Sequence, residues 1–432
     1  MKNCLKSNTY VFITITAFCA CMNVAHAAAN EAVLALAKKE QPALIETLNQ
    51  LTAIESGSRE RAELDKIADV LAARLKALGG KVEMIEPVES DTVRLSDTPD
   101  KIGKMVKATF TGTGSKKILL MAHMDTVYPK GMAAGQPFKI DGDKVYGLGI
   151  ADARGGLATI LHTLSMLKAM NYRDYGTLTV FFNGDEEIGS PGARNHHTRL
   201  GAEHDAVMSF EGGGSPEDDR VRLATSGHAL AYLNVRGRAS HAGAAPERGV
   251  NSLDELAHQI LQLRNMSDPA TGVKVNWTLA RAGIVYNMIP PGAQATGDVR
   301  VARISDYDGI EAKLKERVKN KLLPESSVEL VFERRFPPLE PKPASRAMSV
   351  HAQTIYNELG KKLNVADDAA GGFTDAANAS LKTKAPVVEG FGLRGFGSHT
   401  TNAEYIVMSS IEPRLYLAAR MIMDISSGIA LK

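Results

Sequence analysis

Five side chains that could each bind a metal ion lie at the ends of apolar runs spread over most of the chain. They are His123, Asp152, Glu187, Glu211 and His399. Ligands of an open α/β sheet bind at the edge where the strand ends gather, so we expect these side chains to meet there. Two imidazoles and three carboxylates form a donor set suited to a pair of zinc ions. The pattern therefore predicts a two-metal site on an α/β sheet.

The N-terminus has the features of a secretory signal peptide. Lys2 and Lys6 form a positive segment, Val11–Ala20 is apolar, and the small residues around Ala27 fit a cleavage site. The apolar stretch is shorter than the roughly 20 residues that a membrane span needs. We therefore expect an exported protein, periplasmic or secreted, with residues 1–27 removed.

All cysteines of the chain, Cys4, Cys19 and Cys21, lie within this leader. The mature protein would then have neither disulfides nor thiolate metal ligands, so any zinc must be held by nitrogen and oxygen. Without Lys2 and Lys6, the basic and acidic residues are equal in number. A neutral balance gives no support for binding to nucleic acid or to a membrane surface.

The first part of the chain alternates between helical and strand-like segments. Helical periodicity runs from residue 30 to residue 78, and apolar strands are expected at 117–121, 177–182 and 206–210, with a helix at 158–168. Such a rhythm predicts a largely parallel, doubly wound sheet.

The middle of the chain has a different order of elements. We expect strands at 229–237, 275–288, 293–300 and 327–334, and helices at 251–263 and 305–319. The order βαββαβ is that of a ferredoxin-like sandwich. We interpret residues 226–337 as a domain inserted into a catalytic domain made of 28–225 and 338–432, with a proline-rich return linker.

Two short motifs carry most of the predicted chemistry. On a strand, His123 and Asp125 face the same side, so the carboxylate can orient the imidazole of a metal ligand. Of the adjacent Glu186 and Glu187, one can bind metal while the other moves protons, as hydrolysis requires. Taken alone, each motif also fits a structural explanation without function. His123 could be a surface histidine near a turn, and Glu186 and Glu187 could lie in a solvated acidic turn.

Asp152 lies in the glycine-rich stretch 147–156, which precedes an expected helix. A phosphate-binding loop is the rival interpretation, but the Walker lysine and the spaced dinucleotide glycines are both missing. A carboxylate here could bridge two metal ions. Glu211, His399 and His241 are weak signals when each is taken by itself.

Taken together, these stretches resemble the di-zinc aminoacylase and carboxypeptidase family of metallopeptidases. The similar segments are 121–127, 147–152, 183–187, 240–243, 372–375, 395–399 and 403–405, in order along the chain. Within the family, the chain is most similar to the exported glutamate carboxypeptidases, the carboxypeptidase G group. The resemblance implies a zinc-peptidase-like doubly wound mixed sheet with an inserted ferredoxin-like α+β dimerisation domain, and a homodimer.

The resemblance also implies a role for each site residue. Asp152 would bridge two zinc ions. Asp125 would orient His123, and Glu186 would act as the general base. The remaining zinc ligands would be His123 and Glu211 at one ion, and Glu187 and His399 at the other. His241 would reach the oxyanion from a partner subunit. Arg300 and Asn287 would hold the C-terminal carboxylate of the substrate, since an arginine fork suits that task.

The chain departs from the glutamate-cleaving branch in the expected side-chain pocket. Phe336 stands where that branch has an arginine, and Arg220 and Arg222 stand where it has a lysine and a small polar residue. We expect cleavage of a C-terminal amino acid, first of all glutamate, from folate-like, N-acyl or peptide amides. The alternatives are an N-acyl-amino-acid amidohydrolase or dipeptidase with aromatic or apolar preference, and, more distantly, a non-catalytic periplasmic binding protein.

Overall fold

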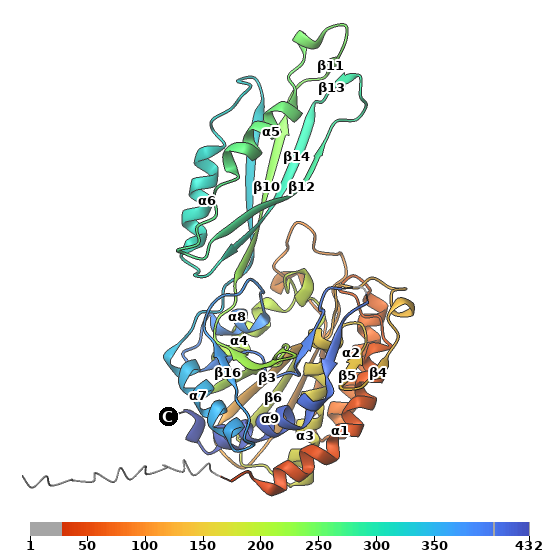
Figure 1. Ribbon diagram of the computed structural model, residues 1–432, viewed down its shortest axis with the longest axis vertical. Coiled ribbons are helices and arrows are strands. Elements are labelled where there is room, and N and C mark those ends of the chain that lie inside the picture. The colour runs from red at the N-terminus through yellow and green to blue at the C-terminus, as the bar shows by residue number, and fades with distance from the viewer. Residues whose placement is uncertain (1–27, 401, 432) are drawn as a thin grey trace, which may run out of the picture.

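The computed structural model describes residues 28–400 and 402–431. The predicted signal peptide, residues 1–27, lies outside them. The chain forms two units, of which the smaller stands above the larger in Figure 1. Among the described residues, no helix combines the length and the apolar character that a membrane crossing requires.

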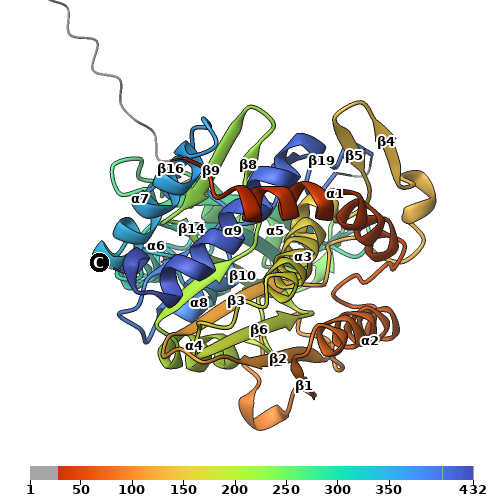
Figure 2. The same ribbon diagram turned by 90° about the horizontal axis from the view of Figure 1, so that it is seen from below.

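The larger unit is built on a six-stranded mixed sheet with the order β1-β2-β6-β3-β7-β17. β6, β3, β7 and β17 run parallel to one another, whereas β1 and β2 pair antiparallel at one edge. Figure 2 shows β1, β2, β6 and β3 lying next to one another. The strands are β1 (Lys81–Ile85), β2 (Met105–Thr111), β3 (Lys117–His123), β6 (Thr177–Asn183), β7 (Ala206–Ser209) and β17 (Val387–Val388).

Helices cover both faces of this sheet because its central strands are apolar on both sides. On β3, Ile118 and Leu120 pack into one core, while Leu119 and Met121 pack into another. The alternation follows from the two-residue period of a strand. The first face is covered by α1 (Glu31–Thr52), α2 (Arg61–Ala77), α3 (Gly155–Ala169), α7 (Pro343–Asn357) and α9 (Ile411–Ser426), and the second by α4 (Arg194–Glu203) and α8 (Asp375–Ser380). The mixed α/β class predicted from the sequence is confirmed.

The smaller unit has a four-stranded antiparallel sheet with the order β12-β14-β10-β15. Its elements follow one another as strand, helix, strand, strand, helix, strand, the ferredoxin-like order. They are β10 (Gly227–Arg236), α5 (Ser252–Leu263), β12 (Lys274–Ala282), β14 (Gly292–Val301), α6 (Asp306–Arg317) and β15 (Ser327–Phe336). This inserted unit has a hydrophobic core of its own, which includes Leu233, Leu256 and Leu314.

The strand expected over residues 275–288 is two strands. β12 ends at Ala282, and the next residue, Gly283, has a φ of 78°, which breaks the extended backbone. After the break, β13 (Met288–Ile289) pairs with β11 (Ser240–His241). These two short strands lie at the end of the inserted unit that is farthest from the larger unit (Figure 1).

Two small sheets complete the larger unit. One has the order β16-β9-β8, with β8 (Gly214–Ser215), β9 (Asp218–Arg222) and β16 (Asn364–Ala366). The other has the order β18-β19-β5-β4, with β4 (Lys139–Asp141), β5 (Lys144–Tyr146), β18 (Gly395–Phe396) and β19 (Tyr405–Val407). β9 carries Arg220 and Arg222, and the loop after β18 carries His399.

Candidate metal centre

Three of the five predicted ligands follow neighbouring strands of the six-stranded sheet. His123 is the last residue of β3, Glu187 lies in the turn after β6, and Glu211 follows β7. Because β6, β3 and β7 are adjacent and parallel, their carboxyl ends meet at one sheet edge. Segments far apart in the sequence therefore present their side chains to the same space.

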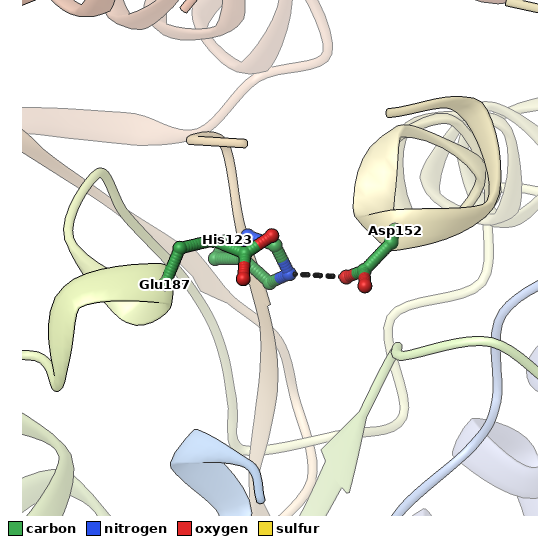
Figure 3. A group of neighbouring side chains, drawn as sticks. All are labelled: His123, Asp152 and Glu187. Carbon is green, nitrogen blue, oxygen red and sulfur yellow. Dashed lines mark hydrogen bonds and ion pairs between the residues drawn. The ribbon is translucent and has the colours of Figure 1, made fainter. Parts of the chain in front are cut away.

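The other two predicted ligands come from loops that approach this edge. Asp152 lies in the turn directly before α3, and His399 lies in the loop after β18 with a φ of 63°. Figure 3 shows His123, Asp152 and Glu187 converging from three different elements.

The structure brings the five side chains into two groups that share Asp152. Nε2 of His123 lies 3.0 Å from Oδ1 of Asp152 and 3.2 Å from Oε1 of Glu211. Nε2 of His399 lies 3.3 Å from Oδ2 of Asp152 and 3.3 Å from Oε2 of Glu187. The two oxygens of one carboxylate thus face two separate histidine–glutamate pairs.

These separations fit metal binding. Zinc bonds of about 2 Å place neighbouring ligand atoms of a tetrahedral site about 3.3 Å apart. The donor atoms of His123, Asp152 and Glu187 also lie within 4.8 Å of one another. Imidazole nitrogen and carboxylate oxygen are both common donors to zinc.

The electrostatics of the group also favour a bound cation. Burial raises the pKa of Glu187 to about 7 and that of Glu211 to about 8, and the nearby Asp152 carboxylate adds to both. Hydrogen bonding to Asp152 and Glu187 raises the pKa of His399 to about 10. Buried acids this close together repel one another when ionised, and a divalent cation would offset that repulsion.

Asp125 lies behind His123, as the sequence predicts for an orienting carboxylate. Its Oδ1 is 3.3 Å from Nδ1 of His123. It also accepts the backbone N–H groups of Glu186 at 3.2 Å and Glu187 at 3.1 Å, and the hydroxyl of Ser58 at 2.7 Å. Fixing the turn that carries the two glutamates is a task that sequence reasoning did not foresee.

Glu186 lines the same cavity as four of the predicted ligands, Asp152, Glu187, Glu211 and His399, but stands apart from their contacts. Among the described residues, no cationic side chain forms an ion pair with it, although it is almost fully buried. Burial raises the pKa of Glu186 well above its usual range. A buried carboxylate with no fixed partner, next to metal ligands, is suited to taking up and releasing a proton.

The cavity above these residues has a volume of about 360 Å³. Its wall on the side of the inserted unit includes Phe373, which stacks on Phe336 with 4.6 Å between ring centroids. Phe336 is buried behind that ring and does not line the cavity itself. Arg222 lines the cavity, whereas Arg220 does not and contacts Asp218 instead.

Three predicted substrate-binding or catalytic residues of the inserted unit lie in different places. Arg300, on β14, reaches the carbonyl of Gly371 at 3.1 Å, close to the cavity wall. His241 is exposed on β11, and the carbonyl of Asn287 accepts the N–H of Ala242 nearby. Within one chain, His241 and Asn287 therefore lie at the far end of the inserted unit, remote from the cavity (Figure 1).

Two buried carboxylates that sequence reasoning did not assign hold the loops of the site. Glu404 accepts the N–H groups of Gly149 and Ala151 at 2.8 Å each and that of Asp152 at 3.2 Å. Glu389 accepts the N–H of Glu211 at 3.1 Å. Glu404 lies in residues 403–405, one of the segments that resemble the metallopeptidase family, so the sequence did contain a signal for it. Glu389 follows an apolar stretch and belongs to no motif that could have marked it.

Comparisons with known proteins agree with this geometry. The family described as peptidase family M20/M25/M40 matches residues 119–424. Carboxypeptidase G2 of Pseudomonas sp. (strain RS-16) is 44% identical over 392 residues, which cover 91% of each chain. An acetylornithine deacetylase of Photorhabdus laumondii is 26% identical over 302 residues, covering 65% of this chain and 74% of that protein.

Solved structures show the same fold at low sequence identity. A tripeptidase from Staphylococcus aureus superposes with a TM-score of 0.74 at 19% identity, covering 90% of this chain and 99% of that one. An M20 family metallo-carboxypeptidase from Sulfolobus solfataricus has a TM-score of 0.70 at 16% identity, covering 89% of this chain and 98% of that one.

Proposed function

The chain belongs to peptidase family M20/M25/M40, and on that premise we propose that it is a zinc-dependent carboxypeptidase that releases a C-terminal amino acid, with glutamate as the first candidate. The family membership confirms the predicted metallopeptidase class and removes the alternative of a non-catalytic binding protein. The observation that carries the proposal is the division of Asp152 between two histidine–glutamate pairs, next to the buried Glu186. The similarity to carboxypeptidase G2 favours glutamate as the released residue.

We propose two zinc ions per subunit. His123, Glu211 and one oxygen of Asp152 would hold the first, and His399, Glu187 and the other oxygen of Asp152 the second. Zinc bound there would polarise the scissile carbonyl and lower the pKa of water.

Glu186 is the proposed general base. Its carboxylate would take a proton from the attacking water and deliver it to the departing amine, so that each turnover returns Glu186 to its starting state. The raised pKa of this buried carboxyl brings it closer to the range in which one group can serve both steps. Asp125 holds Glu186 in place by accepting a hydrogen bond from the backbone N–H of Glu186.

The assignment of His241 to the oxyanion requires a second subunit, because this histidine is remote from the cavity of its own chain. A homodimer formed through the inserted unit is supported by the surface of that unit. β12 is an edge strand, and Leu279 and Tyr286 near its end are 61% and 99% exposed. Sedimentation of the purified protein would test this, and a monomer at all concentrations would contradict it.

The remaining parts of the proposal rest on the sequence. We propose export with cleavage after Ala27, and a catalytic domain of residues 28–225 and 338–432 with residues 226–337 inserted. The substrate would be a small folate-like, N-acyl or peptide amide. Digestion of the mature protein with a protease at low concentration would show whether cuts fall at these boundaries.

The decisive experiment combines a substrate panel with one variant. The zinc-loaded mature protein is assayed for release of glutamate from folate and N-acyl-glutamate, beside N-acyl-phenylalanine and N-acyl-alanine. Glu186→Gln should lower kcat by a factor of about 100 to 10,000, as loss of a general base does, while zinc content stays at the wild-type level. Full activity of this variant with zinc bound would refute the mechanism.

A second candidate is an N-acyl-amino-acid amidohydrolase or dipeptidase with aromatic or apolar preference. The stacked rings of Phe373 and Phe336 beside the cavity favour it, because they give one wall an apolar character. Faster release of phenylalanine or alanine than of glutamate in the same panel would establish this alternative and leave the role of Glu186 unchanged.

A further inference from the structure

Arg222 is a cation that lines the cavity. Its Nη1 donates to the carbonyl of Gly212 at 2.7 Å, and the structure shows no ion pair for it among residues 28–400 and 402–431. The guanidinium is partly buried, and this burial lowers its pKa. Its remaining N–H groups are therefore available to a ligand in the cavity that it lines.

Glu389, an acidic group whose charge acts on Arg222, is engaged elsewhere. One of its oxygens accepts the backbone N–H of Glu211 at 3.1 Å, and the other accepts the hydroxyl of Thr374. Among the described residues Glu389 forms no ion pair with Arg222, so its charge acts on the guanidinium without direct contact. It helps to keep the guanidinium charged without occupying its hydrogen-bonding edge.

The other arginines considered for substrate binding are occupied. Arg220 contacts Asp218 directly. Arg300 forms a bidentate pair with Asp298, with 2.9 Å from Nε to Oδ1 and 2.9 Å from Nη2 to Oδ2, and its Nη1 donates to Gly371. The three arginines thus differ in a way that the sequence does not reveal, since each would be counted equally as a positive charge.

A partly buried arginine without a partner is unfavourable in the free protein, because its desolvation is not offset by an ion pair. A ligand carboxylate would supply that partner and match the guanidinium fork. The ring of Phe373, which also lines the cavity and stacks on both Phe336 and His228, offers an apolar surface for the methylene groups of an acidic side chain.

We propose that Arg222 recognises the side-chain carboxylate of an acidic C-terminal residue and is the main determinant of preference for it. The inference rests on the proposed carboxypeptidase activity and adds the residue that selects the substrate. It gives Arg222 the task that the sequence left open among Arg220, Arg222 and Phe336.

The test compares N-acyl-glutamate with N-acyl-glutamine, which has the same α-carboxylate and a neutral side chain of the same shape. Arg222→Met should lower kcat/KM for N-acyl-glutamate roughly 100-fold and that for N-acyl-glutamine by less than about threefold, since only the former loses a charge pair. Arg222→Lys should restore part of the preference. Arg220→Met, with the same change of charge two residues away, should keep the wild-type ratio of the two substrates.

Several outcomes would overturn the inference. An equal loss on both substrates would mean that Arg222 reads the α-carboxylate or supports the fold, and an equal effect of Arg220→Met would mean a general charge effect. A wild-type enzyme that cleaves other N-acyl amino acids but not N-acyl-glutamate would refute the role proposed for Arg222 and leave the hydrolase activity standing. An enzyme that cleaves none would refute the proposed function as well.

A binding measurement separates substrate recognition from turnover. In the background of Glu186→Gln, calorimetry should show that Arg222→Met weakens binding of N-acyl-glutamate but not of N-acyl-glutamine. Unchanged binding of both ligands would contradict the proposal even if activity had fallen. Zinc content and circular dichroism of each variant confirm that the site and the fold are intact.

Discussion

Asp125 accepts a hydrogen bond from the backbone N–H of Glu186, with 3.2 Å between Oδ1 and the nitrogen. Its other oxygen accepts the N–H of Glu187 at 3.1 Å, and the same carboxylate lies 3.3 Å from Nδ1 of His123. One buried group therefore positions the proposed base and one proposed ligand of each zinc ion.

We expect Asp125→Asn to weaken zinc binding about 10- to 100-fold, as loss of a carboxylate behind a metal-bound histidine does. The two N–H groups are accepted by different oxygens of Asp125, and asparagine replaces one of these oxygens with an NH2 donor. One N–H group therefore loses its acceptor, so kcat should also fall when zinc is saturating. Competition with a chromophoric chelator measures the affinity. Ser58→Ala, which removes only a neutral donor to Asp125, should have a smaller effect on both quantities.

Glu404 should stabilise the loop that carries Asp152, because its carboxylate accepts three backbone N–H groups and the hydroxyl of Tyr128. Glu404→Gln replaces an acceptor with a donor and leaves at least one buried N–H without a partner. We expect a loss of about 2 kcal/mol in the free energy of unfolding, and weaker zinc binding. Urea denaturation of the zinc-loaded protein measures the former, and Tyr128→Phe should cost less. Equal stability of wild type and Glu404→Gln would contradict this role.

The position of the candidate site could be predicted from the sequence for a physical reason. His123, Glu187 and Glu211 each follow an apolar strand, and parallel strands of one sheet end at a common edge. Periodicity does not mark helix caps, so α3 begins at Gly155, before the expected position at residue 158.

Other features depend on contacts that a sequence does not display. Glu404 and Glu389 act through backbone N–H groups of distant loops, which no spacing of side chains reveals. His241 and Asn287 are grouped with the site only by resemblance, and one chain alone keeps them far from it. The difference between Arg222 and Arg300 likewise arises from Asp298, which neutralises only the latter.

Arg335 connects the inserted unit to the larger unit beside the predicted metal centre. Its Nη2 lies 2.7 Å from Oδ1 of Asp97 and donates to the carbonyl of Ile188 at 3.0 Å, in the turn that begins with Glu186. Arg335→Met should lower the free energy of unfolding by about 1 to 2 kcal/mol, since Asp97 is partly solvated. It should also speed hydrogen exchange in residues 186–190.

The matched comparison for Arg335 is Arg346→Met, which breaks an ion pair with Asp367 in which both side chains are about half exposed. That variant should change stability by less than about 0.5 kcal/mol. Hydrogen-exchange mass spectrometry and urea denaturation of both variants give the two readouts. Equal exchange in residues 186–190 of the two variants would show that Arg335 does not steady the turn.

His204 should make the stability of the protein depend on pH. Its Nδ1 lies 2.7 Å from the carbonyl oxygen of Leu200 and its Nε2 lies 2.8 Å from the hydroxyl of Thr179, which fits a neutral ring that donates once and accepts once. Burial lowers the pKa of His204 below its ordinary value of 6.5. Between the lowered pKa and 6.5, the unfolded chain binds a proton that the folded protein does not, so acidification through this window destabilises the folded state.

We expect wild type to lose more stability than His204→Gln when urea denaturation is compared at about pH 8 and about pH 5, since glutamine does not titrate. A loss that is the same for both proteins would show that His204 is not a source of acid sensitivity.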